Sequence, residues 1–158
     1  MKRIANNNTE AKAFLGHFYE EGIGVNKDLK YAFKCYSEAA KIGEESAVNA
    51  LVKRFSFDSN TGISNDELLE CFEFMAKQGG SDAQYECAVF YEKYIKNLDK
   101  AFDYYSLAAS NGNNKALDAL IRFYLFELDE VPWDNQVLEI FEKAAGNGNI
   151  RAQLALAK

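Results

Sequence analysis

Few residues in this chain of 158 have the types and spacing that catalysis or metal binding requires. His17 is the only histidine, so the chain lacks the paired histidines that zinc hydrolases carry on a helix. Gly22-Ile23-Gly24 is not followed by the lysine and hydroxyl residue of a phosphate-binding loop. No group of residues combines a nucleophile, a base and an orienting side chain. We therefore expect no cofactor, no metal ion and no enzymatic activity, with a hydrolase of unknown type as the remote alternative.

The segment 127–134 gathers acidic residues around the only tryptophan and the only proline of the chain. One interpretation is an exposed acidic loop with an aromatic anchor, a composition typical of interface hot spots. Its partner-contacting residues would be Glu127, Asp129, Glu130 and Trp133. The other interpretation is that Val131 and Trp133 pack beneath the loop as a hydrophobic staple for a helix that begins near Asp134.

The net charge of -6 and the isoelectric point of about 4.9 bear on the class of partner. Affinity for phosphates comes mainly from lysine and arginine, so an acidic chain is a poor ligand for nucleic acid. The same reasoning disfavours anionic membrane surfaces. The acidic excess lies in residues 47–82 and 116–158. A basic protein is the electrostatically favoured partner.

No apolar run approaches the roughly 18 residues of a membrane span. The first residues, 1–8, include lysine and arginine but are not followed by the apolar stretch of a signal peptide. We therefore expect a cytoplasmic protein.

Three residue markers recur along the chain with one shared period. Four alanines are each followed eight residues later by an aromatic residue, and successive pairs are offset by 36, 36 and 33 residues. These pairs are Ala11/Tyr19, Ala47/Phe55, Ala83/Tyr91 and Ala116/Tyr124, and Ala152 continues the series. The other two series are Tyr36, Phe72, Tyr105 and Phe141, and Gly43, Gly79, Gly112 and Gly148. Such self-similarity indicates a supersecondary unit that repeats and stacks on its neighbours.

The first repeat predicts two antiparallel helices. Thr9 is a suitable N-cap for the first helix, and Gly16 within it would let the second helix approach closely. Asp28 is a suitable N-cap for the second helix, which we expect to end at Gly43. The expected core stripes are Ala11, Phe14, Leu15, Phe18 and Tyr19 on the first helix, and Ala32, Cys35, Tyr36, Ala39 and Ala40 on the second.

The same pattern predicts an all-α fold, an α/α superhelix (solenoid) of about four helix-turn-helix repeats plus a C-terminal capping helix. The further helix pairs are 45–57 with 64–78, 80–94 with 97–110, and 113–127 with 134–146, with Ser64 and Asp134 as N-caps. A ninth helix at about 149–157 has no partner and should cover the exposed end of the last pair. The repeats then span about 9–46, 47–82, 83–115 and 116–151, with a capping helix at 149–158, all within one domain, 1–158.

The three cysteines fit this repeat pattern. Cys35 and Cys71 each precede an aromatic marker by one residue, and Cys87 occupies the position of Leu15 in the first repeat. Equivalent positions in successive repeats indicate small buried hydrophobic residues. A disulfide or a reactive thiol is the weaker alternative, because the chain has no CxxC motif and no cysteine has a histidine neighbour.

The first repeat, AKAFLGHFYEEGIGVNKDLKYAFKCYSEAAKIG (residues 11–43), resembles the Sel-1-like repeat family, a relative of the tetratricopeptide repeats. The resemblance is carried by Ala11, Leu15, Gly16, Tyr19, Gly22, Gly24, Val25, Asp28, Lys30, Ala32, Tyr36, Ala39, Ala40 and Gly43. The third and fourth repeats keep part of this pattern and the second is degenerate, so the resemblance covers about residues 9–158. It implies a right-handed α/α superhelix that acts as an adaptor for protein–protein contacts, and it implies no reaction. Members with paired cysteines space them eight residues apart, a spacing absent here, so a disulfide-stapled secreted member is not expected.

By analogy with that family, the first helix of each repeat lines the concave side, where a partner would bind. Helical spacing selects the residues that lie between the core stripes. They are Ala13, His17, Glu20, Glu21, Asn49, Lys53, Ser56, Tyr85, Val89, Glu92, Asp118 and Arg122. This mixed set is typical of recognition grooves, whereas a merely solvated groove would be more uniformly charged.

Together these observations predict a non-catalytic module for protein–protein interaction. The most concrete hypothesis is an inhibitor or immunity-type protein that sequesters a basic protein, such as a toxin or a nuclease. A regulatory adaptor that joins partner proteins is the alternative. We expect no nucleic-acid or membrane partner, and either a monomer or a weak homodimer.

Overall fold

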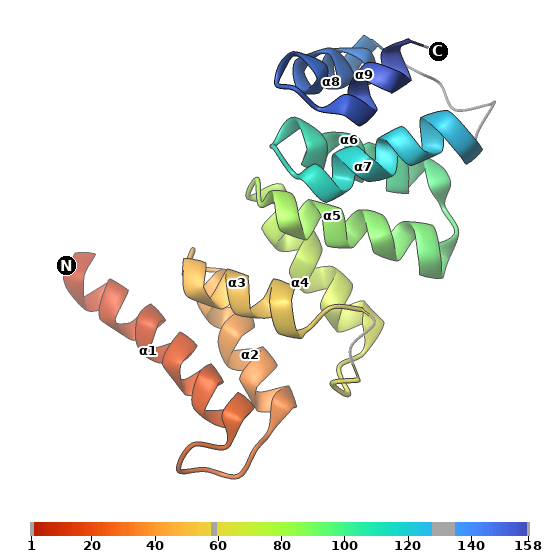
Figure 1. Ribbon diagram of the computed structural model, residues 1–158. Helices are drawn as coiled ribbons and strands as arrows, with labels where there is room; N and C mark the ends of the chain where they lie inside the picture. Colours follow the sequence, from red (N-terminus) through yellow and green to blue (C-terminus); the bar gives the residue numbers. More distant parts are fainter. Residues whose placement is uncertain (1, 58–59, 128–134, 158) are drawn as a thin grey trace. The chain divides into compact units, whose positions relative to one another are not determined.

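The computed structural model describes residues 2–57, 60–127 and 135–157, and the side chains of 8–57, 60–125 and 135–157 (Figure 1). All regular structure in these residues is helical, which confirms the all-α prediction. The helices are α1 (Lys2–Glu21), α2 (Leu29–Ala40), α3 (Glu45–Arg54), α4 (Asn65–Lys77), α5 (Ser81–Phe90), α6 (Leu98–Ser110), α7 (Asn114–Arg122), α8 (Asn135–Gly146) and α9 (Ile150–Leu156). Two π-helical segments, η1 (Tyr91–Ile95) and η2 (Phe123–Glu127), extend α5 and α7. In the part of the chain that the structure describes, no helix has both the length and the apolar content needed to cross a bilayer.

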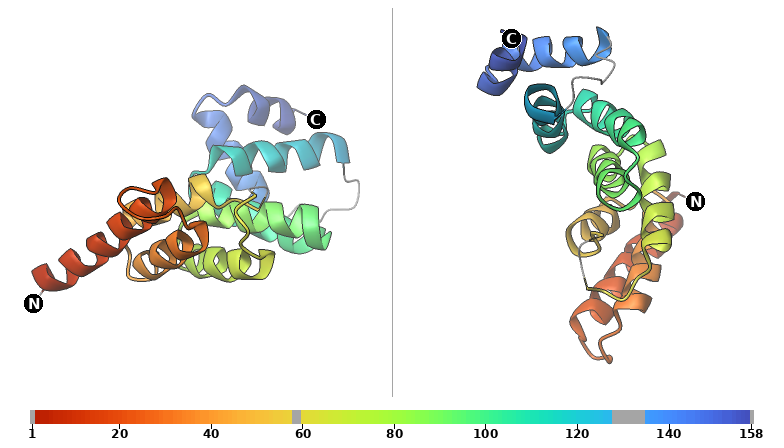
Figure 2. Two further views of the ribbon diagram at one scale, coloured as in Figure 1. Left: turned by 90° about the horizontal axis from the view of Figure 1, so that it is seen from below. Right: turned by 90° about the vertical axis from the view of Figure 1, so that its right-hand side faces the viewer.

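The chain divides into two compact units, an N-terminal unit of Met1–Gln78 and a C-terminal unit of Gly79–Lys158. In the N-terminal unit α1 packs along α2, and α2 packs in turn against α3. In the C-terminal unit the packed pairs are α5 with α6, α6 with α7, and α8 with α9 (Figure 2). Within the units, α3 lies against α2, α7 against α6 and α9 against α8, so a first helix packs on the second helix of the preceding repeat, as expected for stacked repeats.

The residue markers occupy the positions that a repeat requires. The aromatic rings of Tyr36, Phe72, Tyr105 and Phe141 are at most 3% exposed, and the alanine markers from Ala47 onward are fully buried. The glycine markers Gly43, Gly79, Gly112 and Gly148 share φ values of 88–89°, a conformation that glycine adopts without strain. At the first of these turns, the amide of Gly43 donates to the carbonyl of Ala40 and the amide of Glu44 donates to that of Ala39. The same pair of bonds closes the turns at Gly112 and Gly148.

Several local predictions are confirmed. The side chain of Asp28 accepts a hydrogen bond from the amide of Tyr31, and so caps α2. Ser64 and Glu67 form a reciprocal capping box at the start of α4. The three cysteines are buried and unbridged, and burial raises the pKa of the Cys71 thiol. The expected cap Asp134 lies outside the described residues.

The predictions for α1 need correction. The helix begins at Lys2, so Thr9 lies within it and is not its N-cap. The expected core residues Phe14, Leu15 and Phe18 are 57%, 37% and 42% exposed, and Ala11 is exposed too. The side of α1 that is buried carries Ala13, Gly16 and Glu20 instead.

The reason lies in the stacking order of the helices. On α3 the equivalent stripe of Ala47, Leu51 and Phe55 is fully buried, because α2 packs against it. The ring of Phe55 lies 5.5 Å from that of Phe33 and 6.1 Å from that of Tyr36. Among the described residues no helix precedes α1, so its stripe has no such neighbour. An amphipathic pattern predicts which face is apolar, but a neighbouring helix decides whether that face is buried.

The expected pairing within the second and fourth repeats is also looser than predicted. The close pairs inside a repeat are α1/α2 and α5/α6, whereas α3 and α7 pack mainly on the preceding second helices, α2 and α6. Aromatic contacts still connect the two halves of these repeats. The ring of Phe57 lies 5.4 Å from that of Phe72, and the ring of Tyr124 lies 5.7 Å from that of Phe141.

Gly16 provides a test of the helix contact in the first repeat. A Cβ atom at this position would lie 2.9 Å from two ring carbons of Tyr36, so Gly16→Ala forces the ring or the helix to move. We expect a loss of about 1–3 kcal/mol in the free energy of unfolding, although alanine favours helix by about 1 kcal/mol. Urea denaturation followed by circular dichroism measures the change.

Gly146→Ala is the matched control, because a Cβ atom there meets nothing within 4 Å and the residue ends α8 in helical conformation. This control should be as stable as the wild type or more so. A Gly16→Ala variant that gained stability like the control would contradict the close contact with Tyr36.

Candidate partner-binding groove

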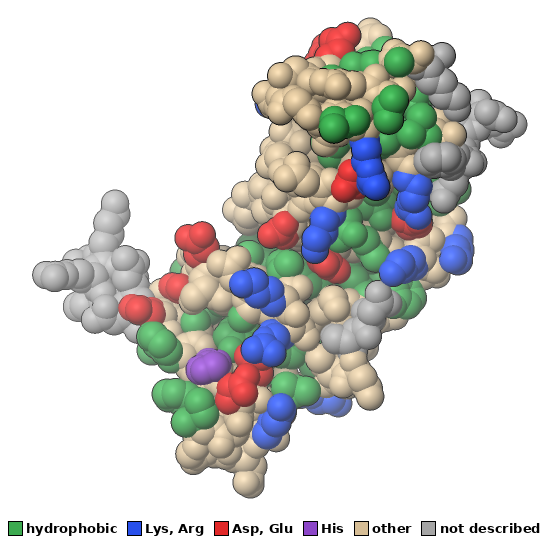
Figure 3. Space-filling view, in the orientation of Figure 1, with side chains coloured by type: hydrophobic (Ala, Val, Ile, Leu, Met, Phe, Trp, Pro, Cys, Tyr) green, Lys and Arg blue, Asp and Glu red, His purple; other side chains and the backbone are tan. Residues whose placement is uncertain are grey.

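A groove of about 540 Å³ lies on the N-terminal unit between α1 and α3. Five of the residues predicted to contact a partner line it: Ala13, His17, Glu20, Asn49 and Lys53. Its other lining residues are Glu10, Phe14, Tyr36, Glu44, Ser46, Ala50 and Arg54. Figure 3 shows the single histidine with exposed hydrophobic side chains on one side and acidic and basic side chains close by. Of the residues predicted in this unit, Glu21 and Ser56 do not line the groove.

The groove exists because small side chains face each other between the two helices. Ala13 is 7% exposed, and Ala50 is half-buried on α3. Phe14 stands at the edge with 57% of its surface exposed. His17, Asn49 and Lys53 are exposed. The groove thus combines an apolar floor with polar groups that can bind a ligand.

The bottom of the groove is closed by a buried polar network. Glu20 is 6% exposed, and it accepts a hydrogen bond of 2.8 Å from the Tyr36 hydroxyl. The Nε atom of Arg54 lies 3.1 Å from Glu20 Oε1, and its Nη2 atom lies 3.7 Å from Glu21 Oε1. A buried carboxylate needs such partners. Glu20 therefore supports the groove structurally in addition to lining it.

His17, Glu20 and Glu21 bring three ligand-type atoms within 4.8 Å of one another. The sequence prediction treated His17 as a lone histidine with no carboxylate four residues away, which is wrong, because Glu20 and Glu21 follow it by three and four residues. The guanidinium of Arg54 already supplies positive charge to both of them. A divalent cation would have to displace Arg54, so the geometry favours ion pairing over metal binding.

Of the residues predicted for the C-terminal unit, Glu92 and Arg122 contact each other, and Tyr85 and Asp118 contact other side chains of the unit. Arg122 Nη2 lies 2.8 Å from Glu92 Oε1, and Glu92 also accepts a hydrogen bond from the Tyr105 hydroxyl. The Tyr85 ring lies 5.9 Å from that of Tyr105. Asp118 pairs with Arg151 at 3.3 Å, and Val89 is half-buried. Glu127 ends η2 and its side chain is not described, while Asp129, Glu130 and Trp133 lie outside the described residues.

The two networks occupy the same repeat positions. Tyr36 and Tyr105 are aromatic markers of the second helix, and Glu20 and Glu92 each follow their alanine marker by nine residues. In the other two repeats the aromatic marker is Phe72 or Phe141, and the position of the glutamate holds Ser56 or Leu125. The acceptor is therefore present where the buried ring carries a hydroxyl, and absent where it does not. This agreement fits the rule that buried polar groups need hydrogen-bond partners.

The networks also predict how stability depends on pH. The pKa of Tyr36 and that of Tyr105 are raised above the ordinary value of 10, mainly because the hydroxyl is buried and secondly because it donates a hydrogen bond to a glutamate. A pKa that is higher in the folded state means that the unfolded chain loses its phenolic proton first as pH rises. The contribution of each tyrosine to the free energy of unfolding is therefore complete below pH 10. Above pH 10 this contribution declines by up to about 1.4 kcal/mol per pH unit for each tyrosine.

Tyr36→Phe combined with Tyr105→Phe should flatten this alkaline decline. At pH 7 the double variant should lose about 1–3 kcal/mol for each glutamate that loses its tyrosine donor, with a larger loss at the buried Glu20 than at the half-buried Glu92. Urea denaturation between pH 7 and 11 measures both effects. The control Tyr31→Phe changes an exposed tyrosine and should stay within about 0.5 kcal/mol of the wild type at pH 7. An alkaline decline as steep in the double variant as in the wild type would refute the role of the two tyrosines.

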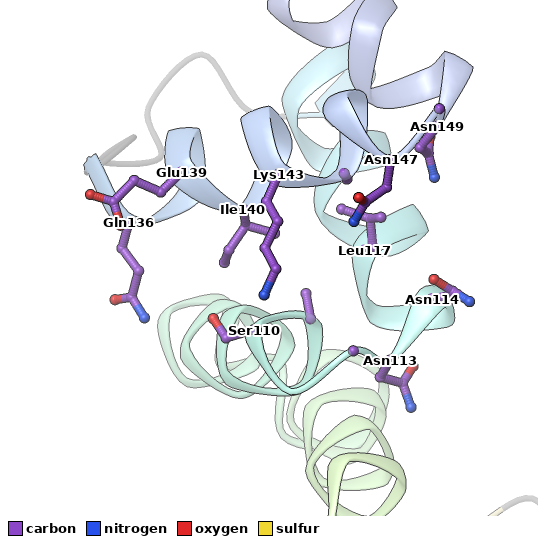
Figure 4. Close-up of a pocket in the computed structure, with 14 residues that line it drawn as sticks. Ser110, Asn113, Asn114, Leu117, Gln136, Glu139, Ile140, Lys143, Asn147 and Asn149 are labelled. Atoms are coloured by element: carbon purple, nitrogen blue, oxygen red, sulfur yellow. The ribbon is translucent and has the colours of Figure 1, made fainter.

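A second cavity, which the sequence did not predict, lies in the C-terminal unit (Figure 4). It measures about 650 Å³ and is formed by α8 together with the turns that precede α7 and α9. Its polar lining includes Ser110, Asn113, Asn114, Gln136, Glu139, Lys143, Asn147 and Asn149. Asn113 and Asn149 also cap α7 and α9 by accepting from the amides of Ala116 and Ala152. The sequence does contain a sign of this cavity, because Asn-Gly-Asn occurs at both 111–113 and 147–149. The glycine series identified these turns but not the asparagines that flank each glycine.

Comparison with known proteins identifies Sel1 repeats in part of the chain. The model of the Sel1 repeat matches residues 9–44 and 81–113. The chain is 34% identical over 55 residues to "DAP3-binding cell death enhancer 1" of Rattus norvegicus, and likewise to that of Mus musculus. That alignment covers 35% of this chain but only 11% of either relative, so the chain spans a small part of their length.

Solved structures agree on the fold. A Sel1 repeat protein from Oxalobacter formigenes is similar with a TM-score of 0.63 and 26% identity, over 96% of this chain and 63% of that one. A protective antigen of uropathogenic Escherichia coli, which displays the SLR fold, is similar with a TM-score of 0.65 and 24% identity. The second likeness covers 95% of this chain and 33% of the antigen, and it is a likeness of fold alone. The repeated markers and the helix-turn-helix units agree with these matches, which identify Sel1 repeats at residues 9–44 and 81–113 and the fold of Sel1 repeat proteins over nearly the whole chain.

Proposed function

We propose that this Sel1 repeat protein is a non-catalytic module that holds a segment of a partner protein in the groove between α1 and α3. The observation that carries the proposal is the groove itself, which has an apolar floor of small side chains and polar groups exposed along it. Recognition surfaces commonly combine these two features. The name of the rat and mouse relatives denotes binding of another protein, which is consistent with this class of function.

In its most concrete form, the module is an inhibitor or immunity-type protein that sequesters one basic protein, such as a toxin or a nuclease. The support is electrostatic, because the chain carries a net charge of -6. Opposite net charges accelerate the encounter of two proteins and suppress wrong partners.

A regulatory adaptor is the second candidate. The observation that favours it is the second cavity, of about 650 Å³, in the other compact unit. Two binding regions in two units would allow two partners to be held at once. An inhibitor needs only one of them.

Capture from the source cell tests the proposed groove. The bait is the full chain, and the groove variant combines Asn49→Ala with Lys53→Ala. If these residues contact the partner, their removal should weaken its capture at least about tenfold. The matched control combines Gln78→Ala with Lys34→Ala, which also removes one exposed amide and one exposed lysine but lies outside the groove. Equal capture by the wild type and the groove variant would exclude this groove as the binding site.

Binding kinetics then separate the inhibitor from the adaptor. An inhibitor of a basic protein should bind a single partner with nanomolar affinity, and its association rate should fall steeply as salt increases. An adaptor should bind more weakly and recover two proteins in one complex. Surface plasmon resonance at several salt concentrations, with mass spectrometry of the captured proteins, measures both properties. An association rate that does not respond to salt would count against sequestration driven by charge.

A further inference from the structure

The charged side chains of the α1–α3 groove are arranged in order along its length. The C-terminal turns of α1 and α3 are joined by the ion pair between Glu20 and Arg54. Glu10, near the middle of α1, and Glu44, immediately before α3, both lie N-terminal to this ion pair on their segments, and both line the groove. One end of the groove is therefore marked by Glu10 and Glu44, and the other by Lys53 and Arg54.

At the first end, two carboxylates can accept a ligand. Glu10 is exposed on α1. Glu44 precedes α3 and accepts a hydrogen bond of 2.8 Å from the Ser46 hydroxyl through Oε1. A hydroxyl donor leaves the negative charge in place, so this end of the groove keeps two anionic groups.

At the other end, one of the two cationic side chains is already in an ion pair and the other is not. Arg54 is paired with Glu20 and Glu21 and is held in place by them. Lys53 is exposed, and within 8–57 and 60–125 none of the ion pairs of the N-terminal unit includes it. Lys53 is thus the groove cation that can pair with a ligand, and His17 adds a hydrogen-bonding group beside it.

The spacing of the two ends defines the size of the ligand. Glu10 and His17 are seven residues apart on α1, and Glu44 and Lys53 are nine apart along α3, so a helical rise of 1.5 Å per residue gives about 10–14 Å. Between the ends, Ala13, Ala50 and Phe14 offer an apolar surface.

We propose that the groove receives a polarised protein segment, with a lysine or arginine at the Glu10/Glu44 end, a carboxylate at the Lys53 end, and an apolar side chain between them. This inference rests on the proposed function, because it specifies the partner of the same groove. It also specifies the partner more narrowly than the proposed function, which requires only that the partner be basic. A segment with cations at both ends would meet Lys53, and a segment with carboxylates at both ends would meet Glu10 and Glu44. Such like-charge contacts discriminate against wrong partners.

Three blocked peptides of about ten residues, built from alanine and leucine between charged ends, serve as probes. The mixed peptide has lysines at one end and glutamates at the other, the cationic peptide has lysines at both ends, and the anionic peptide has glutamates at both ends. Fluorescence anisotropy with the full chain should rank the mixed peptide tightest and the anionic peptide weakest. Because exposed ion pairs contribute about 0.2–1 kcal/mol each, we expect differences of roughly threefold to tenfold between peptides.

Charge reversal provides the decisive comparison. Lys53→Glu should make the cationic peptide the tightest ligand, and Glu10→Lys with Glu44→Lys should make the anionic peptide the tightest. Circular dichroism verifies that the variants remain folded, as expected for substitutions at the exposed Glu10 and Lys53 and the half-buried Glu44. An order of affinities that is the same in the wild type and in both variants would overturn the inference.

Ala50→Phe separates a failure of this inference from a failure of the proposed function. The larger side chain fills the middle of the groove without changing its charges. If Ala50→Phe abolishes capture of the cellular partner but charge reversal does not reorder the peptides, the groove is the binding site and only its polarity is wrong. If Ala50→Phe retains the cellular partner in full, the proposed function of the groove fails and this inference fails with it.

Discussion

The packing of a large aromatic ring against small side chains is the contact on which the rest of this protein depends. The marker rings Tyr36, Phe72, Tyr105 and Phe141 are at most 3% exposed, and alanines with no exposed surface recur at the repeat interval beside them. A ring of this size can be buried between two helices only if residues such as alanine or glycine allow the helices to approach. Replacing the alanines by larger residues would separate the helices, and replacing the rings by small residues would leave cavities. The alanines and aromatic residues therefore recur at a fixed interval because each repeat needs the same packing contact.

A phenolic hydroxyl adds a second requirement to the same contact. A phenylalanine ring needs only apolar neighbours, whereas a buried tyrosine must also place its hydroxyl against an acceptor. In the first and third repeats that acceptor is a glutamate, and the glutamate in turn pairs with an arginine of the next first helix. The hydroxyl thus extends the contact from one helix pair to the repeat that follows. Phe72 and Phe141 do not need this arrangement, and their repeats lack the glutamate.

How far the sequence predicts the structure depends on whether a feature is local or needs a neighbour. The helices, the glycine turns and the caps at Asp28 and Ser64 are determined within a few residues, and they were predictable. The exposed stripe of Phe14, Leu15 and Phe18 was predicted as core, because its spacing is amphipathic and spacing carries no information about the helix that must cover it. The hydrogen bond from Tyr105 to Glu92 and the ion pair between Glu92 and Arg122 were not predictable from spacing either, since they join three helical segments.

The residues predicted to contact a partner follow a different rule from the packing residues. Two residues after the alanine marker, successive repeats place Ala13, Asn49, Tyr85 and Asp118, and six residues after it they place His17, Lys53, Val89 and Arg122. Each series occupies one position of one helix type, yet its members differ in size, polarity and charge. Packing cannot require this variety, because the rings and alanines that carry the packing stay the same from repeat to repeat. The repeat therefore provides a constant framework, and we propose that the positions at which it varies carry the chemistry that distinguishes one partner from another.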